Sequence, residues 1–440
     1  MKHKKILCLI APVLAFSVLA GGCSWNSVSV TSIEKTASYA TEDVYTVYYS
    51  DGTSSEFTVQ HGRDVTVQDL FDRYREEYGD ALTYDEFLQK YLSITVTDHS
   101  LYAVNEALLS SFQVYAANNL SAQQGSAVLY SVNEDKNDAY ILTNYHVAYI
   151  EGTRSGAIAS KITCSVFGSN QTSFNCTYIG GAPASDIALL RANLSEIKAI
   201  NEDVKPVKLA TDYCVGETVY AIGNAEGEGI SATTGIVSVD SEEVNLSVDG
   251  TTRSHRVMRI DAAIYHGNSG GGLFNTKGEL IGITNSGDET DQNINYAIPL
   301  SIVKGTADNI LHYYSDNDSR TVGAYKITLG VTVESKNSRY VYNEMTGKGS
   351  IKEDIVIKSI ASSSLFSPAI ASTLKLQTGD ILTAVEVNGV KFSLNRSYEI
   401  YDILLTVRAG DALKIHYTRA GTAATTSGYT VKSTDLSAIN

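Results

Sequence analysis

The chain has 440 residues, of which 43% are hydrophobic and 19% charged. This composition excludes a disordered chain, and at roughly 150 residues per domain the length suggests about three domains. A net charge of −15 disfavours binding to phosphate backbones, so nucleic acid is excluded as a partner. No histidine or cysteine spacing matches a metal site, and we expect neither a metal nor a cofactor.

The N-terminus is typical of an export signal. The basic stretch "MKHKK" precedes the apolar run "ILCLIAPVLAFSVLA", which is too short for a spanning helix. The run ends in "LAGGC", so small residues directly precede Cys23, as in a bacterial lipobox. We therefore predict a signal peptide over residues 1–22, a lipid on Cys23 and an extracytoplasmic protein held at the cell membrane by that lipid. The alternative is ordinary cleavage and a soluble secreted protein.

Residues 23–41 are rich in Ser and Thr, which predicts a tether. Residues 42–115 predict a small α+β unit. In it, "DGT" separates two strand-like runs, "TVQDLFDRYREEYG" has helical spacing, and Thr83 and Glu86 have the spacing of a capping box. No group of residues in this unit points to a chemistry.

Residues 116–314 contain many short runs of Val, Ile, Tyr and Thr between Gly, Asn and Asp turns, which indicates a mainly-β sandwich or barrels. The stretch "KITCSVFGSNQTSFNCTYIGG" predicts a hairpin with Cys164 and Cys176 placed symmetrically about its turn. A disulfide and two buried thiols both fit this pair, and Cys214 is left free. Residues 322–434 mix strands with one helix, "SYEIYDILLTV".

Three residues of the mainly-β region fit nucleophilic acyl transfer. "ILTNYHV" ends a strand at His146, "SDIALL" begins one at Asp186, and "GNSGG" surrounds Ser269. This chemistry needs a hydroxyl, a base that takes its proton, and a carboxylate that orients the base. The backbone amides of Gly267 and Ser269 can converge on a tetrahedral oxyanion. A turn that merely contains serine is the structural alternative for "GNSGG" alone.

These motifs together resemble a trypsin-like serine protease of the HtrA (Deg) type. The resemblance covers roughly residues 120–305 and rests on "TNYHV", "SDIALL" and "IDAAIYHGNSGGGLFN". It implies two six-stranded β-barrels with the catalytic site between them, and a serine endopeptidase that cleaves unfolded or regulatory envelope proteins. Gly272 stands where the family usually has proline, and Tyr265 and His266 also depart from its pattern.

The resemblance also suggests a substrate preference. In trypsin-like proteases the residue six positions before the nucleophile forms the floor of the specificity pocket, and here it is Ala263. Because a methyl group cannot pair with a cation, we predict cleavage after small or medium aliphatic residues. The substrate is expected to lie extended beside Thr284 and Asn285.

The C-terminal region resembles a PDZ domain of the bacterial protease type, on "TLGVTV", "LQTGDILTAVEVNG" and "SYEIYDILLTV". This implies an α+β domain that senses peptide C-termini: a carboxylate on the amides around Leu329 and Gly330, and a peptide paired with the edge near Val331. The family resemblance further implies a homo-oligomer, often a trimer. The rival interpretation is a non-catalytic scaffold or adaptor that uses the protease fold and the PDZ domain to bind peptides.

Overall fold

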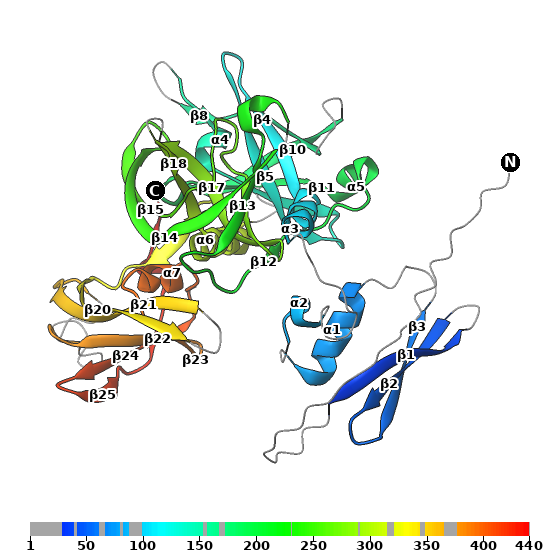
Figure 1. Ribbon diagram of the computed structural model, residues 1–440. Helices are drawn as coiled ribbons and strands as arrows, with labels where there is room; N and C mark the ends of the chain where they lie inside the picture. Colours follow the sequence, from blue (N-terminus) through cyan, green and yellow to red (C-terminus); the bar gives the residue numbers. More distant parts are fainter. Residues whose placement is uncertain are drawn as a thin grey trace. The chain divides into compact units, whose positions relative to one another are not determined.

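The computed structural model divides the chain into two compact units, Met1–Thr97 and Asp98–Asn440, and each is described by itself (Figure 1). The structure describes residues 29–38, 42–60, 67–79, 82–87, 99–152, 156–166, 172–229, 231–288, 291–314, 321–343, 348–364 and 376–439. The signal peptide and Cys23 lie outside these ranges. No helix within them is long and apolar enough to cross a membrane.

The described residues of the first unit form a three-stranded antiparallel sheet and two helices. The strands are β1 (Val30–Ser38), β2 (Glu42–Tyr49) and β3 (Ser54–Gln60), and the helices are α1 (Val67–Tyr78) and α2 (Tyr84–Phe87). The predicted capping box forms, since the backbone amide of Glu86 donates to Thr83 Oγ1 and that of Thr83 donates to Glu86 Oε2. The rings of Phe71 and Phe87 form the small core of the two helices.

One prediction for this unit is corrected. Residues 23–41 were expected to form a tether, but Val30–Ser38 is strand β1, paired with β2 from Val30–Tyr49 to Ser38–Asp43. The segment lacks a clear polar and apolar alternation, yet its β-branched residues favour a strand and β2 supplies the hydrogen-bond partners.

The second unit begins with a closed barrel, in the strand order β10-β11-β6-β5-β4-β9. Its strands are β4 (Ser111–Ala117), β5 (Ala122–Asn133), β6 (Asp138–Thr143), β9 (Lys161–Val166), β10 (Ser173–Ala182) and β11 (Ile187–Asn193). Helix α3 (His99–Leu108) precedes it, and α4 (Tyr145–Ala148), β7 (Tyr149–Ile150), β8 (Ala157–Ile158) and α5 (Leu194–Ile200) lie in its connections. Because α3 and β4 belong to this unit, the predicted boundary at residue 115 is wrong and lies near residue 97.

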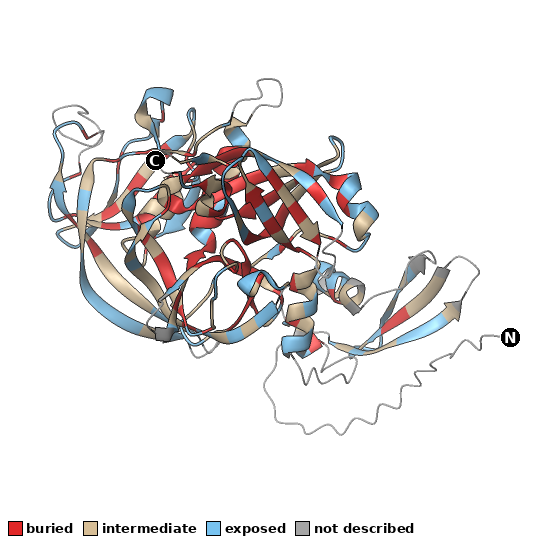
Figure 2. Cartoon of the chain, turned by 90° about the horizontal axis from the view of Figure 1, so that it is seen from above, coloured by how far each residue is buried: buried red, intermediate tan, exposed pale blue. Residues whose placement is uncertain are grey.

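A second ring of six strands follows, because β17 pairs with both β16 and β18. The elements of this region are β12 (Lys208–Leu209), β13 (Thr218–Gly223), β14 (Ser231–Ser247), β15 (Thr252–Ile260), β16 (Gly272–Asn275), β17 (Glu279–Asp288), β18 (Asp291–Pro299) and α6 (Leu300–Tyr313). Figure 2 shows that the buried residues concentrate in the strands of the two barrels. The mainly-β expectation for this region is confirmed.

The C-terminal part is an α+β region with its own apolar core. Its elements are β19 (Tyr325–Ile327), β20 (Val331–Asn343), β21 (Lys348–Ile360), β22 (Ile381–Val387), β23 (Val390–Ser393), α7 (Glu399–Leu404), β24 (Ala412–Arg419), β25 (Thr422–Thr425), β26 (Tyr429–Thr430) and β27 (Leu436–Ala438). The main sheet runs β20-β21-β22-β24-β25. Strand β27 pairs with β19, so this region extends past the predicted end at residue 434.

Polar contacts join the C-terminal part to the second barrel. Asn309 of α6 is fully buried; its side chain donates to the backbone oxygens of Tyr325 and Leu405 and accepts from the Tyr325 amide. Three ion pairs also cross this junction: the largely buried pairs Arg256 with Asp402 and Arg396 with Asp240, and the more exposed pair Lys348 with Asp212.

Both arginines of these pairs lie over one aromatic ring. The guanidinium carbons of Arg256 and Arg396 are 4.3 and 5.0 Å from the centroid of the Tyr398 ring. Both arginine side chains are less than one-sixth exposed. The junction therefore buries charge, and each partner of the Arg256–Asp402 pair depends on the other part for its countercharge, whereas Arg396 is also 3.3 Å from Glu353 of its own part.

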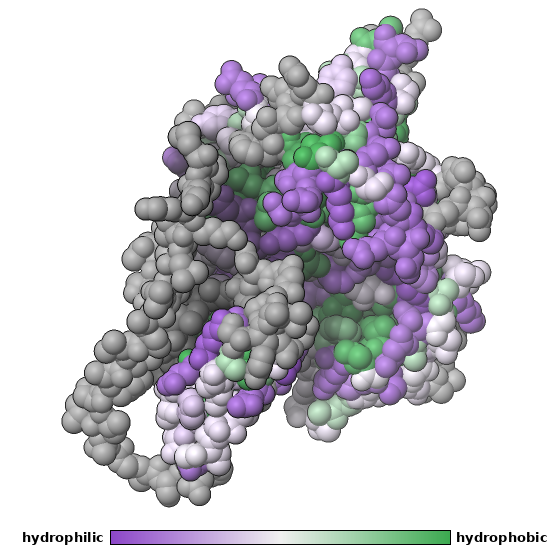
Figure 3. All heavy atoms as spheres, turned by 90° about the vertical axis from the view of Figure 1, so that its right-hand side faces the viewer, coloured by the Kyte–Doolittle hydropathy of each residue, from purple (hydrophilic) through white to green (hydrophobic). Residues whose placement is uncertain are grey.

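The described surface is largely hydrophilic on one face of the molecule (Figure 3). On the face drawn in Figure 3, hydrophilic residues cover much of the described surface and apolar residues gather in a few separate areas. Large exposed apolar side chains such as Leu101 and Leu120 are scattered along the chain, which is normal for a folded protein.

Candidate active site

His146 and Asp186 lie in two different connections between strands of the first barrel, and they are in direct contact. His146 lies on α4, directly after β6, and Asp186 ends a 3-10 turn (Pro183–Ser185) before β11. The His146 Nδ1 atom is 2.7 Å from Asp186 Oδ2, and the His146 backbone amide donates to Oδ1 at 2.9 Å. Asn144 holds the turn by donating its side-chain amide to the Asp186 backbone oxygen. The two residues predicted from separate motifs are thus in direct contact.

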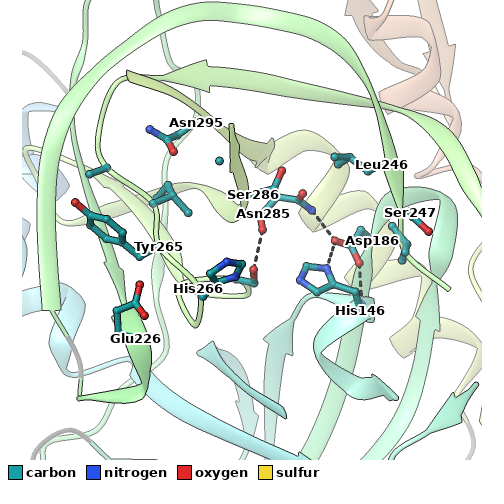
Figure 4. Close-up of a pocket in the computed structure, with 15 residues that line it drawn as sticks. His146, Asp186, Glu226, Leu246, Ser247, Tyr265, His266, Asn285, Ser286 and Asn295 are labelled. Carbon is teal, nitrogen blue, oxygen red and sulfur yellow. Dashed lines mark hydrogen bonds and ion pairs between the residues drawn. The ribbon is translucent and has the colours of Figure 1, made fainter. Parts of the chain in front are cut away.

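Asp186 is fully buried and adopts a left-handed backbone conformation, with φ +51°. A second donor reaches its Oδ2 atom, the Asn285 side-chain amide at 2.5 Å (Figure 4). A buried carboxylate is tolerated when charge-assisted hydrogen bonds satisfy it. The side chain of Asn285, which had been predicted only as part of the substrate strand, therefore helps to fix the carboxylate.

The environment tunes His146 as a base. Burial in the cleft disfavours the imidazolium, but the Asp186 charge and its hydrogen bond to Nδ1 favour it more strongly. The net effect raises the pKa of His146 above its ordinary value of 6.5. A proton held on Nδ1 leaves Nε2 as the acceptor, which is the tautomer that a general base requires.

The loop that carries Ser269 contains two glycines that a larger residue could not replace without a steric clash. A Cβ on Gly267 would lie 2.2 Å from the Asn224 backbone oxygen, and one on Gly270 would lie 2.2 Å from the Ser126 backbone oxygen. Both glycines have positive φ, +93° and +86°, which side chains disfavour. Glycine at these positions is therefore required by the close approach of other segments.

Sequence reasoning missed a residue that supports this loop. Ser126 of β5 is almost fully buried; its hydroxyl donates to the Gly267 backbone oxygen at 2.7 Å and accepts from the Asn224 amide. Its backbone amide donates to the Ser269 oxygen at 2.8 Å. The first barrel therefore fixes the nucleophile loop of the second. The signal for it was weak, because "GSAV" looks like an ordinary strand start.

The candidate oxyanion hole is built from backbone alone. Among the described backbone hydrogen bonds outside helices and strands, the amides of Gly267 and Ser269 do not appear as donors. The preceding carbonyl, that of His266, is held by the Glu226 amide at 2.7 Å. Two backbone amides that converge on one point stabilise a developing oxyanion, and Gly267 and Ser269 stay the predicted pair.

The Ser269 hydroxyl has a different partner from the expected one. Ser269 Oγ donates to the Asn285 backbone oxygen at 2.8 Å (Figure 4). No hydrogen bond joins Ser269 to His146 among the residues that the structure describes. Catalytic hydrogen bonds are often loose in substrate-free structures and tighten in the complex. The structure therefore places all three residues in one cleft, with the serine hydroxyl turned toward β17.

The cleft is a cavity of about 650 Å³, and all three residues line it. Its other lining residues come from the 3-10 turn after β13, from the loop before Ser269, from β17 and β18 and from the β14–β15 hairpin: Glu226, Leu246, Ser247, Val248, Ala263, Ile264, Tyr265, His266, Asn285, Ser286, Gly287 and Asn295. Ala263, the predicted pocket floor, is among these lining residues. The sequence analysis did not predict that residues of the β14–β15 hairpin line this cavity.

The position of Thr284 corrects the predicted substrate strand. Thr284 is 1% exposed, and its backbone amide and oxygen are bonded to Gly271 and Gly270. Strand β16 occupies this edge of β17 as far as Ile283, so a peptide has no access to Thr284. The cavity is lined instead by Asn285, Ser286 and Gly287.

The predicted carboxylate loop lies at the start of the edge strand β20. Leu329 is 5% exposed and its oxygen accepts from the Ser364 hydroxyl, while Gly330 has φ +68°. Val331 begins β20, which pairs with β21 on one side and ends the sheet path on the other.

Comparisons with known proteins find a matching family model and several similar proteins. Residues 125–283 match the model of the trypsin-like peptidase domain. The chain is 29% identical to the serine protease Do-like HtrA of Lactococcus lactis subsp. cremoris, over 71% of this chain and 72% of the relative. It is 32% identical to a probable periplasmic serine protease do/HhoA-like of Haemophilus influenzae, over 68% of this chain and 56% of the relative. A solved structure of the HtrA-type protease AlgW with a tripeptide covers 76% of this chain and 97% of its own, at 23% identity and a TM-score of 0.49.

Proposed function

Because this chain is a trypsin-like serine protease with HtrA-type relatives, we propose that it hydrolyses peptide bonds through Ser269, His146 and Asp186. The observation that carries the proposal is the 2.7 Å contact between His146 and Asp186 in the cavity that Ser269 lines. A general base oriented by a buried carboxylate is the arrangement that activates a serine hydroxyl.

The reaction follows from the positions of these groups. A bound substrate draws the Ser269 hydroxyl from the Asn285 oxygen to His146 Nε2, which takes the proton as Oγ attacks the scissile carbonyl. The amides of Gly267 and Ser269 stabilise the oxyanion. The imidazolium, stabilised by Asp186, then gives its proton to the leaving amine, and water hydrolyses the acyl-enzyme by the same route.

The substrates that we propose are unfolded or regulatory polypeptides outside the cytoplasm. The resemblance to HtrA-type proteases supports this class, and the Haemophilus influenzae relative is named as a probable periplasmic protease. The segment 285–287 supports extended binding, because it lines the cavity beyond the point where β16 stops pairing with β17. A chain that can enter such a cleft must be locally unfolded.

A fluorophosphonate probe tests this proposal against the scaffold alternative. We expect the full-length protein to be labelled at Ser269 and to cleave a reduced, unfolded protein. Both activities should be lost in Ser269→Ala and kept in Ser131→Ala, a serine of β5 that does not line the cavity. An unlabelled, correctly folded wild type that still binds peptides would establish the scaffold function instead.

The C-terminal part is proposed to be a PDZ domain that binds peptide C-termini. Strand β20 supports strand addition, since it lies at the edge of its sheet beside the loop of Leu329 and Gly330. Ser269→Ala protein, which cannot digest the ligand, should bind peptides with a free apolar C-terminus. C-terminally amidated copies should not bind, because the amides around Gly330 recognise a carboxylate. Equal binding of both peptide forms would rule out this recognition.

We also propose that the protein is anchored by a lipid on Cys23. The support is the lipobox-like stretch after the apolar run. Cys23→Ser should move the protein from the membrane to the soluble fraction, and mass spectrometry of the wild-type N-terminus should find the lipid. Membrane retention of Cys23→Ser without lipid on the wild type would refute the anchor. A trimer, which the resemblance supports, is tested by light scattering on the lipid-free protein.

A further inference from the structure

A buried amide occupies the end of the catalytic cavity away from His146 and Asp186. It belongs to Asn295 of β18, which is 2% exposed and lines the cavity together with Ala263. Figure 4 shows its side chain on the opposite side of the cavity from the His146–Asp186 pair. This residue was not singled out by the sequence motifs.

The strand pairing puts Asn295 at the base of the specificity pocket. One wall of the pocket is the loop from Ala263 to His266, and the other is the segment from Asn285 to Gly287. Asn295 pairs in register with Gly287 on one side and with Ile260, three residues before Ala263, on the other. It therefore lies between the two walls.

Gly287 lets the amide face the cavity. A Cβ at Gly287 would lie 2.4 Å from Asn295 Oδ1 and 3.2 Å from the Ile264 oxygen. Any side chain at residue 287 would thus fill the space between the amide and the opposite wall. Glycine at this position therefore leaves the Asn295 amide uncovered on the side of residue 287.

The base of the pocket is polar but uncharged. Ala263 offers only a methyl group, and the two carboxylates that line the cavity are Asp186, which is bonded to His146, and Glu226, whose residue is exposed. A carboxamide has two N–H donors and an oxygen with two lone pairs, so it can hold a contact within the protein and also bond a substrate side chain.

We propose that Asn295 determines the residue after which this protease cuts, and that it selects small, uncharged side chains that form hydrogen bonds. The inference rests on the proposed function. Threonine, serine or asparagine can form a further hydrogen bond with the amide, whereas an aliphatic residue of the same shape packs against it and offers no hydrogen bond. Sites built to bond a polar group reject the apolar isostere. Ala263 alone predicts an aliphatic preference, and Asn295 changes that expectation.

Matched peptide pairs test the preference in the full-length enzyme. Each pair differs only at the residue whose carbonyl is attacked: Thr against Val, Ser against Ala, and Asn against Leu. We expect kcat/KM to favour the polar member of each pair by about 10- to 100-fold. In Asn295→Leu this preference should disappear or reverse. The rate of fluorophosphonate labelling reports that the variant is folded and its serine active.

An isosteric charge change gives an independent readout. Asn295→Asp puts a carboxylate at the pocket base and should raise kcat/KM at least about 10-fold for peptides with Lys or Arg at the cleaved position. Asn201→Asp, the same change at the end of α5 and outside the cavity, should leave the profile unchanged.

The outcomes separate the two proposals. If the wild type makes Ser269-dependent cuts but favours the aliphatic member of each pair, the role of Asn295 is refuted and the protease function stands. The role is also refuted if Asn295→Asp labels normally and gains no basic cleavage. If no cut depends on Ser269, both proposals fail.

Discussion

Replacing Asp186 by asparagine removes one charge and one acceptor from a point where three donors converge. The donors are the His146 backbone amide, His146 Nδ1 and the Asn285 side-chain amide. An asparagine has one side-chain oxygen, which can face either the backbone amide or the other two donors. In both orientations its NH₂ group points at a donor. The variant therefore cannot reproduce the native set of hydrogen bonds.

The size of the effect follows from the tautomer of His146. When the new NH₂ group faces Nδ1, that nitrogen must accept, so the proton moves to Nε2 and the base is blocked. Loss of the orienting carboxylate in triads of this kind lowers kcat by about 10⁴, which is about 5.5 kcal/mol in the activation free energy. We expect that loss for Asp186→Asn in a peptide-hydrolysis assay, with Asp203→Asn, on an exposed loop, as the control. A loss smaller than about tenfold would refute this role of the carboxylate.

The same variant changes the pH dependence. Catalysis needs neutral His146, so activity rises as the pH passes through its pKa. Asp186 raises that pKa above 6.5, and the acid limb of kcat/KM in the wild type should accordingly have its midpoint above 6.5. Without the carboxylate, burial remains and lowers the pKa, so the limb should move to lower pH. An unchanged midpoint would mean that Asp186 does not set the pKa of the base.

Three further changes test other parts of the structure. Gly267→Ala puts a Cβ 2.2 Å from a backbone oxygen and should lower fluorophosphonate labelling by about 100-fold; labelling at the wild-type rate would contradict the oxyanion-hole assignment. Cys164 and Cys176, with sulfurs 3.4 Å apart, should exchange with oxidised glutathione to form a disulfide, seen as a mass lower by two hydrogens and as protection from alkylation. Two alkylatable thiols after that treatment would argue against it. Arg256→Met leaves Asp402 buried without its cation and should cost about 3–5 kcal/mol in urea unfolding, whereas a cost below about 1 kcal/mol would show that the pair is screened.

The sequence predicted the parts of the site that motifs encode. His146, Asp186 and Ser269 each sit in a short local pattern, and the structure brings them to one cavity. Residues that act through tertiary contact carry no such pattern. Ser126 supports the nucleophile loop from the other barrel, and Asn295 reaches the pocket only because β18 pairs beside Gly287.

In the fold, too, the local elements were predicted, whereas the elements that depend on tertiary contacts were not. The hairpin around "DGT" and the capping box at Thr83 are local, and both form as predicted. The strands β1 and β4 were missed or misassigned because their identity depends on partners: β1 is completed by β2, and β4 closes the barrel between β5 and β9. Thr284 was misplaced for a related reason, since only the pairing of β16 shows that its edge of β17 is occupied.

The buried charges at the C-terminal junction bear on how such chains diversify. Arg256 and Asp240 lie in the protease, whereas Asp402 and Arg396 lie in the C-terminal part. Recombination or a designed chimera that exchanged one part alone would bury an arginine or a carboxylate opposite an unrelated surface, at a cost of several kcal/mol. The two parts are therefore expected to be inherited together, and a transplanted C-terminal part should function only when the matching residues of the second barrel move with it.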